Sequence, residues 1–269
     1  MPSGNNTKKV EQNLIDNEKE LTKFHLLIII SSIGVLGFLL RIYYLPIEVP
    51  ITLDGLVFFW YANDISLLRT LPLDYTPANN GWPIFLSIFF KIFDSNNFME
   101  YMTLQRLVSC TLSILTIIPI YFICRKFFSE KFALVGATIF AFEPRIIQNS
   151  IFGISEPLFI ILVSTAILFF LNKQKQLIFL SFPLIALATI VRSEGIILII
   201  PFSILYVIKF RKSKKTIFEF PVLILIFILV ILPISTYKID VTGEDAIFSR
   251  IPNVFESKQI SENNNSLEN

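Results

Sequence analysis

Cysteine and histidine are scarce in this sequence. Its 269 residues include two cysteines and a single histidine. Cys110 and Cys124 lie 14 residues apart in one apolar stretch, which is about 21 Å along a helix at roughly 1.5 Å per residue. A disulfide needs Cα atoms within about 7 Å of each other, so these two residues cannot bridge. The inventory therefore excludes a disulfide framework and a Cys/His metal finger.

Charged residues are scarce as well. They make up 16% of the chain, whereas soluble domains contain about 25%. Hydrophobic residues make up 54%, and the mean hydropathy is +0.66, so lipid is the expected solvent for most of the chain. The high apolar content and the lack of a heptad or glycine repeat exclude disorder, coiled coil and collagen. A net charge of +2 gives no indication of a nucleic-acid partner.

The apolar residues are gathered in long stretches. After a polar segment, residues 1–23, the stretch 24–45 predicts an uncleaved signal-anchor helix, because a basic start and a small-residue cleavage site are missing. Arg41, near its end, is expected to snorkel to the interface. The other stretches are 103–124, 132–149, 154–171, 176–191, 195–208 and 217–237. The predicted fold is an all-α transmembrane bundle of about seven spans over residues 24–237, although several stretches are shorter than the ~20 residues of a straight span. A flexible polar tail, residues 238–269, follows.

The positions of the basic residues predict how the chain crosses the membrane. Lys and Arg collect on the cytoplasmic side of membrane helices. With a cytoplasmic N-terminus and a crossing at each apolar stretch, 14 of the 23 basic residues fall inside. The clusters Lys173/Lys175 and Lys209–Lys215 then both lie inside, so residues 176–208 must cross twice, with Arg192 in the outer turn. One tilted helix through these residues is the alternative. We expect a multi-pass protein of the cell membrane.

The longest predicted external loop, residues 46–102, contains two apolar segments that are too short to span. Residues 53–69 place apolar side chains near helical spacing with Asp54 among them, and residues 82–93 begin with a tryptophan. Amphipathic helices that carry tryptophan lie in the interface plane. We therefore expect interfacial helices in this loop.

Ionisable residues near membrane depth are costly and are therefore functional hypotheses. On the predicted outer side these are Asp54, Glu143-Pro144-Arg145, Glu156, Arg192 and Glu194. Carboxylates and guanidiniums on one face suit transfer from an anionic lipid carrier. A carboxylate takes a proton from the acceptor hydroxyl, and arginine holds the phosphate that leaves.

Each of these residues also has a purely structural interpretation. Asp54 could cap a helix that starts at this residue. Glu143 and Arg145 could form an interfacial ion pair beside Pro144, where a helix is expected to end. The remaining alternatives are a first-turn acid at a helix N-terminus for Glu156 and a local pair across a tight turn for Arg192 and Glu194.

The order of the motifs favours the functional interpretation. An acid at the start of an external helix is followed by the segments YTPANNGWPIFLSIFFKIF, ISEPLFIIL and ATIVRSEGIILIIP. Over about residues 24–236 the chain resembles the GT-C superfamily of integral membrane glycosyltransferases. The similarity is greatest to the branch of protein O-mannosyltransferases and lipid A aminoarabinose transferases, in which the later turn commonly reads Thr-Arg-Pro-Glu-Gly.

This resemblance implies roles for five residues. Asp54 matches the first acid of the family's loop motif and would be the catalytic base. Glu156 and Glu194 would bind substrate, and Arg192 and Arg145 would bind the lipid phosphate.

The sequence departs from the family pattern in three places. The family often has Asp-Glu where this chain has Asp54-Gly55, so the second carboxylate is missing. The segment before Trp82 lacks a lysine found in some members, so phosphate binding must use an arginine. The chain also stops after about seven predicted passes, as a minimal enzyme, a fragment or an inactive paralogue would.

The resemblance implies a hexosyltransferase. It would move a sugar from a polyprenyl (dolichyl or undecaprenyl) phosphate to a protein or glycolipid acceptor on the extracytoplasmic face, with inversion. No cofactor is expected, and a divalent-metal requirement cannot be read from the residues. One alternative is a transporter, which would have inverted repeats, and none is visible. The other is a non-catalytic membrane scaffold, in which Asp54 could be replaced without effect.

The predicted topology can be tested by cysteine-accessibility labelling of intact cells. A cysteine at position 79 should react with an impermeant reagent added from outside, because residues 46–102 are expected to be external. A cysteine at position 213 should be protected, because it lies in the basic cluster. Labelling of position 213 but not of position 79 would show that the orientation is reversed.

Overall fold

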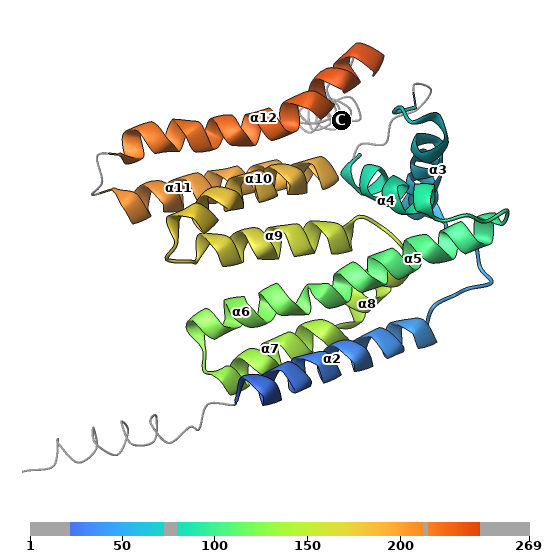
Figure 1. The fold of residues 1–269 in the computed structure, drawn as a ribbon, viewed down its shortest axis with the longest axis horizontal. Coiled ribbons are helices and arrows are strands. Elements are labelled where there is room, and N and C mark those ends of the chain that lie inside the picture. The colour runs from blue at the N-terminus through green and yellow to red at the C-terminus, as the bar shows by residue number, and fades with distance from the viewer. Residues whose placement is uncertain (1–21, 73–79, 212–214, 243–269) are drawn as a thin grey trace, which may run out of the picture.

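The computed structural model describes residues 22–72, 80–211 and 215–242, and all regular structure in these ranges is helical. The helices that form the body of the bundle are α2 (Lys23–Tyr43), α5 (Phe98–Leu115), α6 (Ile117–Phe127), α7 (Glu130–Phe142), α9 (Glu156–Phe170), α10 (Lys175–Val191), α11 (Ile199–Phe210) and α12 (Thr216–Thr242). The other elements are α3 (Leu53–Leu68), α4 (Gly81–Ile92), α8 (Pro144–Ile151) and the 3-10 helix η1 (Ser193–Leu198). The helices of the body run side by side, while α3 and α4 gather at one end (Figure 1).

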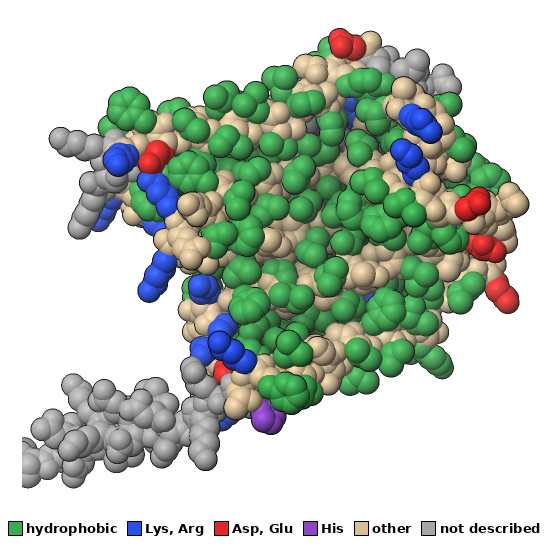
Figure 2. All heavy atoms as spheres, viewed as in Figure 1, with side chains coloured by type: hydrophobic (Ala, Val, Ile, Leu, Met, Phe, Trp, Pro, Cys, Tyr) green, Lys and Arg blue, Asp and Glu red, His purple; other side chains and the backbone are tan. Residues whose placement is uncertain are grey.

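The surface of the bundle is largely apolar (Figure 2). Side chains such as Leu36, Ile139, Phe218 and Leu229 are exposed along the helices, as expected where lipid is the solvent. Among the described residues, four helical segments are long and apolar enough to cross a membrane: Lys23–Tyr43, Phe98–Phe127, Ser193–Phe210 and Ile217–Asp240. The predicted all-α membrane bundle is thus confirmed, and the number of seven spans stays a prediction.

Four clusters of buried apolar side chains form the core of the described residues, and α9 contributes to the two largest. The first lies between α9, α10, α11 and α12, and the second between α3, α4, α5, α9 and the end of α10. In the second cluster the side chains of Phe59, Trp82 and Leu86 are fully buried. Although α3 and α4 were predicted to lie in the interface plane, much of their apolar surface therefore faces protein.

Many of the basic residues gather at one end of the bundle. Figure 2 shows Lys and Arg side chains at the end where Figure 1 places the α6–α7, α9–α10 and α11–α12 connections. Arg125 and Lys126 lie in the last turn of α6, Lys175 starts α10, and Lys209 lies in the last turn of α11. The fold thus brings together the loops that the charge pattern assigns to one side. Which side is cytoplasmic stays a prediction.

The chain reverses direction at Arg192. α10 ends at Val191, Arg192 is extended (φ −145°, ψ 124°), and η1 and α11 return beside α10. A Cβ on Gly195 would lie 2.9 Å from the backbone nitrogen and Cα of Thr189, so this tight return requires glycine. One continuous helix through residues 176–208 is excluded.

The stretch predicted as one span over residues 132–149 is two helices. α7 ends at Phe142, and α8 begins with Pro144 at its first position, where the missing N–H costs nothing. The Glu143 Oε2 accepts a hydrogen bond from the Ile146 backbone nitrogen at 2.7 Å. Glu143 therefore caps α8, and the ion pair considered for Glu143 and Arg145 is not formed.

Two expected boundaries are shifted in the structure. Thr52 is the N-cap residue of α3, so Asp54 lies in the first turn and is not the cap. α12 continues to Thr242, beyond the limit predicted at residue 237. Most of the two predicted polar tails, residues 1–21 and 243–269, lies outside the described residues.

The prediction that Arg41 snorkels to the interface is wrong. Its side chain is fully buried, because α2 packs against α5, α7 and α8. Nε donates to Ser150 Oγ (3.2 Å), Nη2 to Ser113 Oγ (2.9 Å), and Nη1 to the carbonyl oxygens of Gly37 (2.9 Å) and Ala141 (3.0 Å). One guanidinium therefore links four helices.

Candidate active site

The start of α3 packs against the turn between α8 and α9. A Cβ on Gly55 would lie 2.9 Å from the Phe152 carbonyl oxygen and 2.5 Å from Ile51 Cγ2. Residue 55 must therefore be glycine for the two segments to approach this closely. The contact places Asp54, which directly precedes Gly55, beside the segment that leads into Glu156.

The start of α4 packs in the same way against the end of α10. A Cβ on Gly81 would lie 2.7 Å from the Val191 backbone nitrogen, so the α4 backbone closely approaches the residue before Arg192. Asn80, which precedes α4, is buried and donates its amide Nδ2 to the Tyr61 hydroxyl at 3.3 Å. Both segments of the predicted external loop therefore contact helix ends that carry ionisable residues.

Three of the predicted site residues form one ion-pair cluster. Arg192 Nη1 lies 2.5 Å from Glu156 Oε1, and Arg192 Nη2 lies 3.2 Å from Glu194 Oε1. The exposed fraction of the side chain is 26% for Arg192, 27% for Glu156 and 60% for Glu194. The tighter contact is thus with the less exposed carboxylate. The local pair considered for Arg192 and Glu194 is present, and the first-turn position considered for Glu156 is confirmed.

Electrostatics favour the charged form of Arg192. Partial burial lowers the pKa of Arg192, but the carboxylates of Glu156 and Glu194 outweigh it and raise this pKa above its ordinary value. The second carboxylate oxygen of Glu156, Oε2, is buried and has no hydrogen-bond partner among the described residues. It is an unused acceptor next to the guanidinium.

Asp54 is an exposed acid in the first turn of α3. No hydrogen bond or ion pair joins its carboxylate to another described residue. The preceding residue, Leu53, has a φ of +54°, a left-handed conformation that costs a non-glycine residue on the order of 1–3 kcal/mol and that is often found at functional sites. The Asp54 carboxylate is thus exposed beside a strained backbone residue.

Arg145 is not part of the ion-pair cluster. It lies exposed in the first turn of α8, and α8 packs on α2, α5, α7 and α9. Within the described ranges no ion pair or hydrogen bond links Arg145 to Glu156 or Arg192. The structure thus joins Glu156, Arg192 and Glu194 and leaves Arg145 separate.

A neutral side chain that the sequence analysis did not single out joins the two acid-bearing segments. Gln105 Nε2 donates to the Gly55 carbonyl at 3.0 Å and to the Gly153 carbonyl at 2.7 Å. Trp82 Nε1 donates to the same Gly153 carbonyl at 3.0 Å. The search for ionisable residues missed Gln105, although an amide within an apolar helix is itself a signal, because its burial requires partners.

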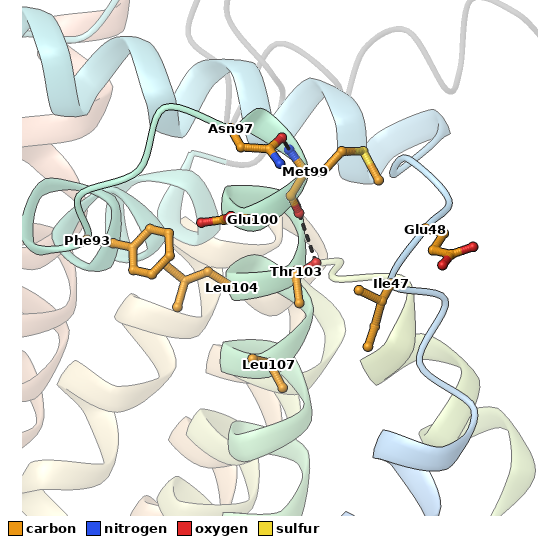
Figure 3. Close-up of a pocket in the computed structure, with 9 residues that line it drawn as sticks. All are labelled: Ile47, Glu48, Phe93, Asn97, Met99, Glu100, Thr103, Leu104 and Leu107. Atoms are coloured by element: carbon orange, nitrogen blue, oxygen red, sulfur yellow. Dashed lines mark hydrogen bonds between the residues drawn. The ribbon is translucent and has the colours of Figure 1, made fainter.

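An open cleft of about 510 Å³ lies along the first half of α5 (Figure 3). Its lining residues are Ile47, Glu48, Phe93, Asn97, Met99, Glu100, Thr103, Leu104 and Leu107. At roughly 100° per residue, Met99, Thr103 and Leu107 face away from Gln105 on the helix. The cleft therefore lies on the opposite side of α5 from the contacts with Gly55 and Gly153.

Comparison with known families identifies the chain's relatives. A family model described as dolichyl-phosphate-mannose-protein mannosyltransferase matches residues 81–237, more than half of the chain. The chain belongs to this family. The predicted resemblance to membrane glycosyltransferases of GT-C type is thus confirmed. Comparisons with curated proteins and with solved structures gave no match.

Membership of the mannosyltransferase family indicates a membrane enzyme that uses a dolichyl-phosphate-linked sugar. The matched segment begins at Gly81 and includes the Glu156–Arg192–Glu194 cluster and Arg145. Asp54 precedes it, so the family match gives no support for Asp54, whose case depends on its position beside the segment that leads into Glu156 and on a carboxylate without a partner among the described residues. The described residues contain no group of three His, Cys, Asp or Glu side chains that could hold a metal ion.

The packing at Gly55 predicts that this residue cannot be changed without cost. Gly55→Ala should lower the free energy of unfolding by about 1–3 kcal/mol, because the added Cβ would overlap backbone that cannot move easily. Gly34→Ala on α2 is the control, since a Cβ there would make only an ordinary contact at 3.6 Å. Thermal unfolding of the purified protein in detergent measures both. Equal stability of the two variants would show that residue 55 tolerates a side chain.

Proposed function

We propose that the protein transfers a hexose from a polyprenyl-phosphate carrier, dolichyl or undecaprenyl, to a hydroxyl group of a protein or glycolipid acceptor on the extracytoplasmic face of the cell membrane. The observation that carries this proposal is the Glu156–Arg192–Glu194 cluster, which lies within the family match and includes the first residue of α9, shortly after the contact between Gly55 and Phe152. In this orientation the N-terminus and the basic end of the bundle are cytoplasmic.

Asp54 is the general base in this reaction. Its carboxylate takes the proton from the acceptor hydroxyl as the hydroxyl oxygen attacks the anomeric carbon. The bond between that carbon and the phosphate oxygen breaks, and the polyprenyl phosphate leaves with the electron pair. Because attack and departure occur on opposite faces of the carbon, the sugar configuration inverts.

Arg192 stabilises the leaving phosphate, which takes the place of one of the two carboxylates that bind the guanidinium. With one positive and two negative side chains, the cluster has a formal charge of −1, which does not favour an anion. Glu194 is the partner that gives way, because its contact is longer and its side chain is more exposed. Arg192 Nη2 then donates to a phosphate oxygen, while Glu156 keeps Nη1 in place.

The remaining proposed contacts follow from position. Glu194, once it has left Arg192, can accept hydrogen bonds from sugar or acceptor hydroxyls, and the buried, unused Oε2 of Glu156 becomes a second acceptor when Glu194 moves aside. Arg145 is exposed and forms no ion pair among the described residues, so it can contact the carrier phosphate as a separate surface charge.

One observation favours a non-catalytic membrane scaffold as the second candidate. Both terminal nitrogens of Arg192 already have carboxylate partners, which is also what a purely structural ion pair at a helix junction would show. In a scaffold, replacement of Asp54 would have no effect, and Arg192 would matter only for stability.

Replacement of Arg192 distinguishes a phosphate contact from a structural ion pair. Arg192→Ala should reduce transfer by the equivalent of about 2–3 kcal/mol, the scale of one lost donor to a developing anion. Arg192→Lys should recover only part of the activity, because a point charge replaces the two-nitrogen fork. Transfer of labelled mannose from dolichyl-phosphate mannose in membranes measures this. Arg211→Ala, an exposed arginine at the basic end, is the control, and wild-type turnover in both Arg192 variants would make the arginine structural.

Asp54→Asn tests whether Asp54 acts as the general base or only stabilises the start of α3. The structure places Asp54 in the first turn, where loss of its charge should cost only about 0.3–1 kcal/mol of helix stability. Loss of general-base catalysis should instead lower the transfer rate roughly 10²–10⁴-fold. The same assay, with a quantitative blot for protein abundance, measures both effects.

The matched control for this experiment is Asp64→Asn, which lies on the same helix. It should change neither abundance nor transfer substantially. Equal transfer by the Asp54 and Asp64 variants would remove the case for Asp54 as the base and favour the scaffold.

A further inference from the structure

Gln105 occupies a central position between the parts of the proposed site. Its side chain is fully buried in the middle of α5. Its single amide nitrogen donates to the carbonyl of Gly55, the residue after Asp54, and to the carbonyl of Gly153, three residues before Glu156. Both protons of one NH₂ group are thus used to join the two acid-bearing segments.

The backbone on both sides is shaped to accept this amide. Gly153 has a φ of +67°, and a Cβ there would lie 3.0 Å from Gln105 Cγ. A side chain at this position would therefore push the amide away. Trp82, also fully buried, donates to the same carbonyl from α4, so α4 is tied to the same point.

Packing alone does not explain why residue 105 carries an amide. Gln105 Oε1 is buried and has no hydrogen-bond partner among the described residues, and such a group costs about 1–3 kcal/mol. An apolar side chain of the same volume would avoid this cost. Gln105 touches none of the ionisable residues of the site through a hydrogen bond, so its effect on them passes through the backbone.

We propose that Gln105 is a positioning residue, which holds Asp54 at a fixed separation from the Glu156–Arg192 ion pair by binding the Gly55 and Gly153 carbonyls with one amide nitrogen. This role rests on the proposed transfer function. Asp54 as the base and Arg192 as the phosphate contact act on opposite faces of the anomeric carbon, so the rate depends on the distance between these two side chains. A misplacement of about 1 Å can reduce a rate on the order of 10²-fold.

The test compares three variants of the full-length protein in lipid nanodiscs. Gln105→Met keeps the volume and removes both donors. Gln105→Glu keeps the shape but retains a single donor, and only when the carboxyl group is protonated. Ser109→Ala is the matched control, because Ser109 is equally buried one turn along α5 and its hydroxyl has no partner among the described residues.

The first readout is kinetic, with dolichyl-phosphate mannose as donor. Gln105→Met should lower kcat roughly 10–100-fold and leave the KM for the donor within about threefold, because Gln105 does not contact the substrate. Ser109→Ala should stay close to wild type. The activity of Gln105→Glu relative to wild type should rise as the pH is lowered from 8 to 6, because protonation restores one donor, whereas a purely packing role predicts no such dependence.

The second readout does not need activity. Hydrogen–deuterium exchange in Gln105→Met should increase in residues 51–57 and 152–156 and remain unchanged in α10, α11 and α12. If wild-type protein transfers no sugar, the proposed function fails, and exchange alone decides whether Gln105 ties the two segments. A wild-type kcat in Gln105→Met, a loss that appears mainly in KM, or unchanged exchange in these two segments would overturn the inference.

Discussion

The Gly153 carbonyl is the contact on which the arrangement of the candidate site depends. In a chain surrounded largely by lipid, a backbone polar group must find its partner within the protein. This carbonyl accepts hydrogen bonds from Trp82 on α4 and Gln105 on α5, and Gln105 also binds the start of α3. Because α9 begins a few residues later with Glu156, the same contact sets where the ion pair to Arg192 forms. The starts of α3 and α4, the middle of α5 and the turn before α9 are thus held together by hydrogen bonds at this carbonyl and at Gln105.

The sequence was sufficient to predict where helices form, but not which side of each helix packs against the rest of the protein. Apolar stretches indicate helices directly, because only a helix satisfies its own backbone in lipid, and the charge pattern indicated the reversal at Arg192. Arg41 shows the limit. Its position near a helix end suggested exposure, yet its partners include Ser150, 109 residues away. Which side of a helix meets protein is decided by packing between distant segments, and an almost uniformly apolar helix shows no periodicity that would reveal it. A helix end at Pro144 was indicated by the proline between Glu143 and Arg145, but the stretch 132–149 was still counted as a single crossing, although α8 is much less apolar than α7.

The candidate site was predictable as a set of charges but not as a geometry. Glu156, Arg192 and Glu194 could be named because charge near membrane depth is costly, whereas the 2.5 Å contact between Glu156 and Arg192 joins residues 36 positions apart. Gln105 has no charge and belongs to none of the motifs, so only its contacts identify it. Gly55 was interpreted as a missing acid. The structure gives a steric reason for the glycine, because a side chain there would meet the Phe152 carbonyl.

The charge balance of the cluster has a consequence for the proposed reaction. Without a bound anion, two carboxylates neutralise Arg192, so its guanidinium has little attraction for other anions at the surface. A carrier phosphate must replace Glu194, and that exchange is favourable only if the phosphate is held at the same time by other groups, since a lone exposed pair contributes little. The exposed Arg145 is suited to assist by contact with the phosphate, and the buried, unused oxygen of Glu156 by contact with the sugar once Glu194 has moved aside. Selection of a sugar-linked phosphate over a free anion would then follow from the number of contacts made together, and Arg192 would become fully available only when the donor is in place.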